Sequence, residues 1–317
     1  MNERQDETYQ AASMYYVQGD TMENIARRLD VSRSTVSRML KDARDSGMVR
    51  ITLTEPGSPT SALAAAISTR FGVRTHIVSM RDDTGNIARL ERVARVAAGL
   101  ANEVVQDGDI VGVAWGTTTG AVANQLPHHP KNDVTVVQLN GAANPQTSGI
   151  PYAGVILRTM ARAWGAQIQP FPVPAFFDDP ATRRMLWRER SISRILDTQA
   201  KADVAIFGVG SLTSGLPSHV YAAGYLDESD FAQLEEERVS GDVCTFFLRG
   251  DGSWRDIEIN QRASGPNPEQ LSRVKRRICV VATPEKFGAL HGALRAGVAT
   301  DLVVDDHTAR ALMQLNA

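Results

Sequence analysis

The chain has 317 residues, of which 43% are hydrophobic and 22% charged, a composition that excludes a disordered protein and supplies enough apolar surface for a sizeable core. This length exceeds that of one small domain, so we expect two domains. The formal net charge of -2 excludes a uniformly basic nucleic-acid-binding protein. Any contact with nucleic acid must come from a local basic patch.

Cysteine usage and the N-terminal composition bear on the compartment. Cys244 and Cys279 both lie in apolar runs, where we expect buried free thiols in a reducing compartment rather than a disulfide. The first residues are polar and charged, and no window of about 18 apolar residues follows them. We therefore expect a cytoplasmic protein without a membrane span.

The first fifty residues predict three short helices. Apolar residues at helical spacing precede Gly19, which ends the first helix. Thr21 and Ser32 are suited to cap the second and third helices, because their hydroxyls accept N–H groups of the first helical turn. Asp30 lies between these helices, in a turn where glycine is the commonest residue. The spacing resembles that of a helix-turn-helix.

The outward positions of the third helix carry hydrogen-bond donors suited to base edges and phosphates. They are Arg33, Ser34, Thr35, Ser37, Arg38 and Lys41. Residues 27–50 contain seven Arg or Lys against three Asp, so positive charge is concentrated on this helical pair. We predict that the third helix binds double-stranded DNA. The alternative is a solvated helical bundle whose arginines only maintain solubility.

The chain after the third helix indicates a domain boundary. Residues 49–53 alternate in the manner of a short strand. Residues 55–61 have the Pro-, Gly- and Ser-rich composition of a linker. We therefore predict a helix-turn-helix domain over 1–54, a linker over 55–61 and a second domain over 62–317.

Strand and helix patterns alternate through the second domain. We expect strands at 74–80, 110–114, 134–139, 168–171, 204–208, 244–248, 278–283 and 302–304. We expect helices at 62–71, 87–105, 121–126, 150–164, 183–201, 285–296 and 308–315. This order predicts a doubly wound, mostly parallel α/β sheet. Ligands of such sheets bind beyond the C-terminal ends of the strands, where the strand order reverses.

The stretch from Gly108 to Gly120 combines an apolar strand, a glycine and three threonines before a helix. The free N–H groups and the dipole of such a helix start favour an anion, and threonine hydroxyls add donors. A phosphate or the oxygens of a sugar would fit this turn. The alternative is an ordinary turn whose threonines only cap the helix.

Polar or glycine-containing loops also follow other predicted strands. They include residues 138–141, 208–212, 241–243 and 283–286. These loops stand in the order found in one family. The same order includes Trp115 and Gly116, the run from Asp203 to Ser211, and the closing segments 294–297 and 302–306. Residues 5–317 resemble the SorC family of transcriptional regulators, also described as DeoR-like sugar-binding regulators.

This resemblance implies an N-terminal helix-turn-helix and an effector domain similar to sugar-phosphate isomerases and deaminases. It places the phosphate loop of the family on Gly116, Thr117, Thr118 and Thr119, with Lys286 as an opposite cation. It also implies that Asn140, Gly141 and Asp242 face sugar hydroxyls.

One departure from the family pattern affects the expected ligand. The family often has a glycine pair before the Lys286 position, whereas this chain has Thr283, Pro284 and Glu285. The extra carboxylate makes a neutral sugar or polyol a rival to a sugar phosphate. A solvated helix lysine is the alternative interpretation of Lys286, because a helix start disfavours a cation.

Other motifs carry no expected chemistry. His128 and His129 lack further ligands at metal-binding spacing, and Ser211 is outside a nucleophile-elbow motif. We expect no metal, no cofactor and no catalytic residue. The proline- and phenylalanine-rich residues 170–177 would either cover the pocket or pack on the end of the sheet.

Two functional hypotheses remain. The first is a cytoplasmic regulator that binds operator DNA and a sugar, sugar phosphate or polyol effector. A helical head of this size contacts one half-site, so a homo-oligomer, a dimer or a tetramer, is expected. The alternative is a sugar-phosphate isomerase or deaminase with an accessory head. Such an enzyme needs an acid-base pair, and only Asp242 is a candidate.

Overall fold

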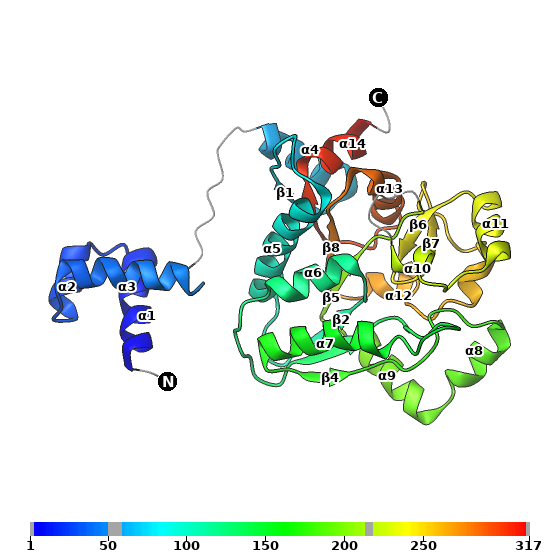
Figure 1. Ribbon diagram of the computed structural model, residues 1–317, viewed down its shortest axis with the longest axis horizontal. Helices are drawn as coiled ribbons and strands as arrows, with labels where there is room; N and C mark the ends of the chain where they lie inside the picture. Colours follow the sequence, from blue (N-terminus) through cyan, green and yellow to red (C-terminus); the bar gives the residue numbers. More distant parts are fainter. Residues whose placement is uncertain (1–2, 50–58, 213–217, 315–317) are drawn as a thin grey trace. The chain divides into compact units, whose positions relative to one another are not determined.

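The computed structural model describes residues 3–49, 59–212 and 218–314. The chain divides into two compact units, Met1–Pro56 and Gly57–Ala317, and Figure 1 labels the elements of each. The smaller unit contains α1 (Glu3–Tyr16), α2 (Met22–Arg28) and α3 (Arg33–Asp45). Its apolar core consists of Ala11, Ala12, Ile25, Val36, Met39, Leu40 and Ala43.

The caps and the turn of the predicted helix pair are present. The Thr21 hydroxyl accepts the N–H of Asn24 at 3.3 Å, and the Ser32 hydroxyl accepts that of Thr35 at 3.1 Å. Asp30 adopts a φ of 52°, the left-handed conformation that aspartate tolerates better than most residues. An aspartate therefore serves in a turn where glycine is commoner.

The predicted linker over 55–61 ends earlier than expected. Helix α4 (Pro59–Phe71) already includes residues 59–61, because a proline fits the first helical turn, where its missing N–H has no partner to lose. The remainder of that linker, and residues 50–53 of the predicted strand, lie outside the described residues.

The larger unit is built on a seven-stranded sheet in which every neighbouring pair is parallel. The strands in spatial order are β1 (Arg74–Val78), β9 (Asp301–Asp305), β8 (Arg276–Val281), β5 (Val204–Gly208), β2 (Ile110–Val113), β3 (Thr135–Gln138) and β4 (Gln167–Gln169). The central strands are continuous apolar runs because helices cover both of their faces. The predicted doubly wound parallel sheet is confirmed.

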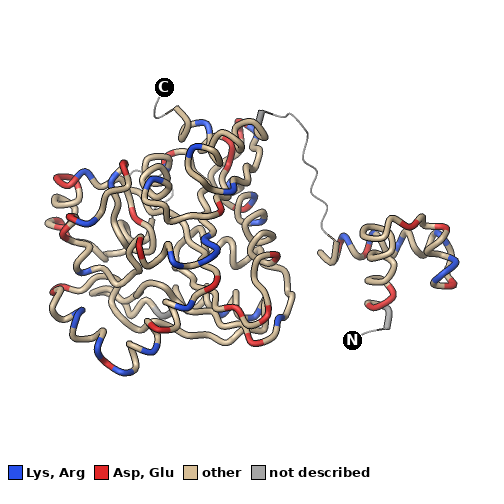
Figure 2. The backbone as a smooth tube through the Cα atoms, turned by 180° about the vertical axis from the view of Figure 1, so that it is seen from behind, with Lys and Arg blue, Asp and Glu red and all other residues tan. Residues whose placement is uncertain are grey.

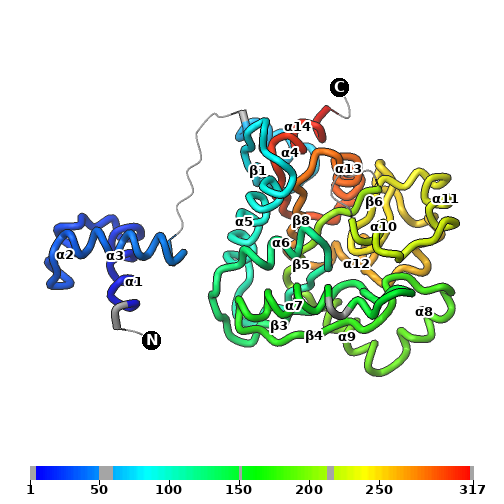
Figure 3. The backbone as a smooth tube through the Cα atoms, viewed as in Figure 1, coloured from blue at the N-terminus to red at the C-terminus, as the bar shows by residue number. Residues whose placement is uncertain are grey.

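Two groups of helices cover the two faces of the sheet, as the tube in Figure 3 shows. One apolar core packs beneath α5 (Asn86–Val104), α6 (Thr117–Gln125) and α7 (Ile150–Trp164). The other packs beneath α4, α13 (Phe287–Arg295) and α14 (Asp306–Gln314). The strand order reverses between β2 and β5, because β3 and β4 lie on one side and β8 and β9 on the other. A ligand pocket is expected at the C-terminal ends of these two strands.

The strand predicted at 244–248 begins later than expected and does not belong to the main sheet. The chain instead forms an antiparallel pair, β6 (Val239–Val243) and β7 (Phe246–Arg249), outside the main sheet. Cys244 and Thr245 form the turn with φ values of 53° and 66°. Such a two-residue turn needs positive φ at both positions and is normally made by Asn or Gly. The turn was therefore not predictable from its sequence, because cysteine and threonine are unusual at these two positions.

The helix predicted at 183–201 is two helices, α8 (Pro180–Leu186) and α9 (Arg190–Ala200). The chain bends between them at Trp187, whose ring packs against Phe171 and Phe177 at centroid distances of 5.6 and 5.4 Å. Phe171 and Phe177 are themselves buried. The segment 170–177 therefore packs on the end of the sheet and does not cover the pocket.

Acidic and basic residues are interspersed over the larger unit (Figure 2), consistent with its lack of a uniform charge. Within the described ranges, no helix has both the length and the apolarity to cross a bilayer.

Candidate functional site

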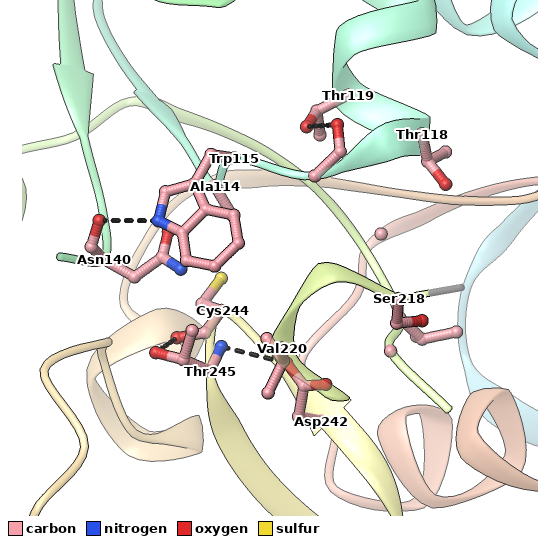
Figure 4. Close-up of a pocket in the computed structure, with 14 residues that line it drawn as sticks. Ala114, Trp115, Thr118, Thr119, Asn140, Ser218, Val220, Asp242, Cys244 and Thr245 are labelled. Carbon is pink, nitrogen blue, oxygen red and sulfur yellow. Dashed lines mark hydrogen bonds between the residues drawn. The ribbon is translucent and has the colours of Figure 1, made fainter. Parts of the chain in front are cut away.

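A pocket of about 440 Å³ lies where the strand order reverses (Figure 4). Three segments supply most of its lining: the turn after β2, the turn after β5 and the β6–β7 turn. The lining residues are Ala114, Trp115, Gly116, Thr118, Thr119, Asn140, Gly208, Val209, Gly210, Ser218, Val220, Asp242, Cys244 and Thr245. Of the predicted loops, 138–141, 208–212 and 241–243 contribute lining residues together with the turn after β2, whereas 283–286 does not.

The start of α6 forms one wall of the pocket. Helix α6 begins at Thr117, so the N–H groups of its first turn have no carbonyl partner within the helix. Thr119 is buried, and its hydroxyl donates to the Gly116 carbonyl at 3.1 Å. Thr118 faces the turn after β5. A Cβ added to Gly208 in that turn would lie 3.3 Å from the Thr118 Cβ. This wall offers hydrogen-bond donors and the positive end of a helix dipole.

Asn140 supplies a buried acceptor. Its side chain is 1% exposed, and its Oδ1 has no hydrogen-bond partner among the described residues. The backbone here is held firmly, because the Asn140 carbonyl accepts from Gln138 Nε2 at 2.7 Å and from Trp115 Nε1 at 3.2 Å. A buried polar atom without a partner costs about 1–3 kcal/mol. A ligand hydroxyl that donated to Oδ1 would recover this free energy.

Asp242 supplies a second acceptor from β6, and Figure 4 shows it across the pocket from the α6 threonines. Its Oδ2 accepts the N–H of Thr245 at 3.0 Å, whereas its Oδ1 has no hydrogen-bond partner in the described chain. Burial raises the pKa of Asp242 to about 6, against the opposing effects of Tyr221, the Thr245 N–H and Lys286. Gly210 is required beside it, because a Cβ there would lie 1.9 Å from Oδ1.

Three predicted residues do not line the pocket. Thr117 is exposed to solvent. Gly141 lies outside the pocket and packs against the Pro174 backbone, because a Cβ there would lie 2.2 Å from the Pro174 carbonyl oxygen. Lys286 is 7% exposed and donates to the Val209 carbonyl at 3.0 Å, so the interpretation as a solvated helix lysine is wrong. Burial lowers the pKa of Lys286, which the charge of Asp242 partly offsets.

Aromatic residues flank the pocket, and none of them was predicted to be a site residue. Trp115 stacks on Tyr225 at a centroid distance of 5.2 Å and meets Tyr152 edge-on at 6.1 Å. Tyr152 in turn stacks on His219 at 4.1 Å. Trp115 directly follows an apolar strand, a position that could have indicated a pocket residue. The tyrosines gave no such signal, because only folding brings them to Trp115.

In the smaller unit, α3 has two distinct faces. Arg33, Ser34, Ser37, Arg38 and Lys41 are exposed, Thr35 is half-buried, and the apolar residues face the other helices. Arg33 Nε pairs with Glu23 at 2.9 Å. Ser32 is tied to the first turn by contacts to the Ser34 and Thr35 hydroxyls at 2.7 and 2.8 Å. The predicted DNA-contacting set thus shares a solvent-facing surface.

The histidine pair has ordinary hydrogen bonds. His128 Nδ1 contacts the Arg162 carbonyl at 3.2 Å, and His129 Nδ1 contacts Asn102 Nδ2 at 3.1 Å. No group of three or more metal-ligating side chains occurs among the described residues.

Comparisons with known proteins agree with this two-part architecture. The family model "Putative sugar-binding domain" matches residues 57–314, and that of sigma-70 region 4 matches residues 10–46. The chain belongs to the SorC family of sugar-binding transcriptional regulators. It is therefore a DNA-binding regulator with a sugar-binding effector domain.

Two relatives and two solved structures illustrate the similarity. The chain is 33% identical to the deoxyribonucleoside regulator of Bacillus subtilis, over 98% of each chain. It is 25% identical to the sorbitol operon regulator of Klebsiella pneumoniae, over 96% of each. A domain of "a possible sugar-binding transcriptional regulator" from Arthrobacter aurescens matches with a TM-score of 0.76 at 47% identity, covering 82% of this chain and 99% of that one. Full-length SorC from Klebsiella pneumoniae has the same fold, with a TM-score of 0.73 at 24% identity, covering 96% and 97%.

Proposed function

We propose that the pocket at the end of β2 and β5 binds a sugar or polyol effector, free or phosphorylated, and that its occupation changes operator affinity. The observation that carries this proposal is the pair of buried acceptors, Asn140 Oδ1 and Asp242 Oδ1, which lie in one pocket and accept no hydrogen bond from the described residues, with the Tyr221 hydroxyl close to the Asp242 carboxyl. Hydroxyl groups are donors of matching size, and a polyhydroxylated ligand presents several at once. Relatives named for deoxyribonucleosides and sorbitol support this ligand class.

We assign the opposite end of the ligand to the start of α6. Thr118, Thr119 and Gly116 border the free N–H groups there, which favour a phosphate or an oxygen-rich end. Among the described residues, the lining contains no lysine or arginine. Lys286 contributes from behind by holding the Val209 carbonyl, so a phosphate would be bound chiefly by N–H and hydroxyl donors.

We assign operator binding to the exposed face of α3, with Arg33, Ser34, Thr35, Ser37, Arg38 and Lys41 as the contacting set. One such helix covers one half-site, so we propose a homo-oligomer whose effector domains assemble it. An effector that binds two quaternary states unequally then shifts operator affinity. The chain acts in the cytoplasm in this proposal.

We propose that the pocket performs no catalysis. Acid-base chemistry on a sugar needs two poised groups, and Asp242 is the one carboxylate among the described lining residues. Burial raises the pKa of the neighbouring Cys244 thiol well above its ordinary value, which leaves it unreactive. Turnover of an aldose or amino-sugar phosphate by the protein would favour the enzymatic alternative.

Thermal melting of the full-length protein tests the effector class. The panel comprises 2-deoxyribose, 2-deoxyribose 5-phosphate, sorbitol and sorbitol 6-phosphate, because a ligand that binds only the native state raises the midpoint. A shift with phosphorylated compounds alone, lost in Thr118→Ala but kept in Thr159→Ala on α7, indicates an anion at α6. A shift with the free compounds indicates recognition through hydroxyls. Binding that is unaffected by Asn140→Leu would place the ligand elsewhere and contradict the proposal.

A further inference from the structure

A second cleft lies behind the effector pocket, between the α8–α9 pair and α12 (Pro268–Ser272). It is open to solvent on one side and has a mixed apolar and polar lining, the character expected of a small-molecule site. Its larger apolar lining residues are Leu139, Trp187, Leu196, Pro266, Leu271 and Val274. None of these residues lines the effector pocket, so the cleft is a separate cavity.

The charged groups of this cleft are both arginines. Arg183 and Arg273 line it, and no aspartate or glutamate does within the part of the chain that the structure describes. Neither arginine forms an ion pair with another described residue. Arg183 lies over the Trp187 ring at 5.3 Å, and its Nη1 donates to the Gln261 carbonyl at 3.0 Å. Its Nε is buried and has no hydrogen-bond partner in the described part of the chain.

The neutral polar groups of the cleft are largely engaged. Gln199 Nε2 donates to the Gln138 carbonyl at 2.7 Å, and the Ser264 hydroxyl is paired with both Gly141 and Ala175 at 2.9 Å. Gln270 forms a capping box with Asn267. The cleft thus offers two guanidinium groups without an ion pair to a described residue, those of Arg183 and Arg273, which favour an acceptor of negative charge.

The two cavities share a thin wall. Leu139 faces the cleft, whereas Asn140, the next residue, faces the effector pocket. Gly265 lines the cleft and abuts the Cys244 carbonyl, which a Cβ would approach to 1.8 Å. Cys244 belongs to the effector pocket. This packing keeps the cavities distinct, so variants of one wall residue can be assigned to one cavity.

We propose that this cleft is a second ligand site, and that it binds an organic anion with an apolar body of aromatic size. The body lies against Leu196, Leu271 and Trp187, and the anionic group accepts from the Arg183 guanidinium. An arginine fork over an indole ring suits a carboxylate or sulfonate attached to a flat group. A polyhydroxylated sugar would leave the apolar lining without a partner.

The test is a fluorescence titration of the full-length protein with 1-anilinonaphthalene-8-sulfonate. We expect saturable binding with one site per chain. Arg183→Gln weakens it about tenfold, the effect of losing a hydrogen bond to a charged group. Leu196→Trp fills the cleft and abolishes it. Arg184→Gln, on an exposed neighbour outside the cleft, leaves the affinity unchanged.

Thermal melting of each variant accompanies the titration, so that loss of folding is recognised. Arg183→Lys keeps the charge but loses the planar fork, and we expect an affinity between those of the wild type and Arg183→Gln. Equal affinity in the wild type, Arg183→Gln and Leu196→Trp would overturn the proposal. Loss of binding in Asn140→Leu instead would place the probe in the effector pocket and also overturn it.

Discussion

The exposed face of α3 and the effector pocket differ in how much their functional residues cost the stability of the fold. On α3 the side chains proposed to contact DNA lie on one solvent-facing side of a single helix, with only Thr35 half-buried. In the pocket, Asn140 and Asp242 come from distant segments, and each holds an acceptor out of water without a partner. The first arrangement costs the fold almost nothing, whereas the second costs about 1–3 kcal/mol for each buried atom.

This difference predicts where ligand binding and stability are linked. Substitutions on α3 should change operator affinity while leaving unfolding unaffected, because solvated side chains contribute little to stability. Substitutions in the pocket should change effector affinity and stability together. The backbone strain of the β6–β7 turn, with positive φ at Cys244 and Thr245, belongs to the same pattern of cost at a functional site.

The largest effect is expected for Gly210→Ala. The new Cβ would lie 1.9 Å from Asp242 Oδ1, so the carboxylate must move out of its position in the pocket. We expect loss of effector binding in calorimetric titration and a free energy of unfolding lower by about 1–3 kcal/mol. Gly288→Ala is the matched control, because a Cβ there meets nothing within 4 Å.

A change with pH follows from Asp242. Its folded pKa of about 6 exceeds the ordinary value of 3.8, so between these values the native state binds more protons than the unfolded state. Its contribution to the free energy of unfolding therefore falls by about 3 kcal/mol as the pH rises from about 4 to above 6. Asp242→Asn removes this contribution. Urea unfolding at several pH values measures it, and identical pH profiles for both proteins would refute the assignment.

Arg38→Ala tests the other side of the comparison. Loss of a base or phosphate contact costs about 1–3 kcal/mol, so we expect operator affinity to fall ten- to a hundredfold in fluorescence anisotropy. The melting temperature should not change, because Arg38 is exposed. Arg194→Ala, on exposed α9, is the control. Unchanged operator affinity in Arg38→Ala would remove α3 from the DNA interface.

The smallest effect is expected for Lys41→Ala. A lysine at this end of α3 suits a phosphate contact, which carries no sequence information. We expect operator affinity to fall only a few-fold, and the slope of log affinity against log salt concentration to decrease by about one. A salt titration measures this slope. An unchanged slope would show that Lys41 makes no phosphate contact.

The helical head and the parallel sheet were predictable because their signals are local. Ser32 and Thr21 indicate helix starts, and apolar runs such as 204–208 indicate buried strands. The β6–β7 turn was missed because Cys244 and Thr245 adopt a conformation that their side chains disfavour. The break before α9 was missed because only tertiary contacts of Trp187 produce it.

The site was predictable where it consists of strand-end loops. Gly116, Thr118, Thr119, Asn140 and Asp242 meet in one pocket because the strand order reverses between β2 and β5. The position of Lys286 was not predictable. In the sequence, a buried lysine that donates to the Val209 carbonyl looks the same as a lysine that binds a ligand. The aromatic group around Trp115 depends on residues that are distant in sequence, and no local pattern marks it.

The most direct test joins the two regions in one measurement. Full-length protein is bound to an operator duplex selected from a random library, and the effector identified by thermal melting is titrated while anisotropy is recorded. For the wild type, we expect operator affinity to change at least about fivefold at saturation. Asn140→Leu should bind the operator normally and show no response. An effector that occupies the pocket without changing operator affinity would contradict the account.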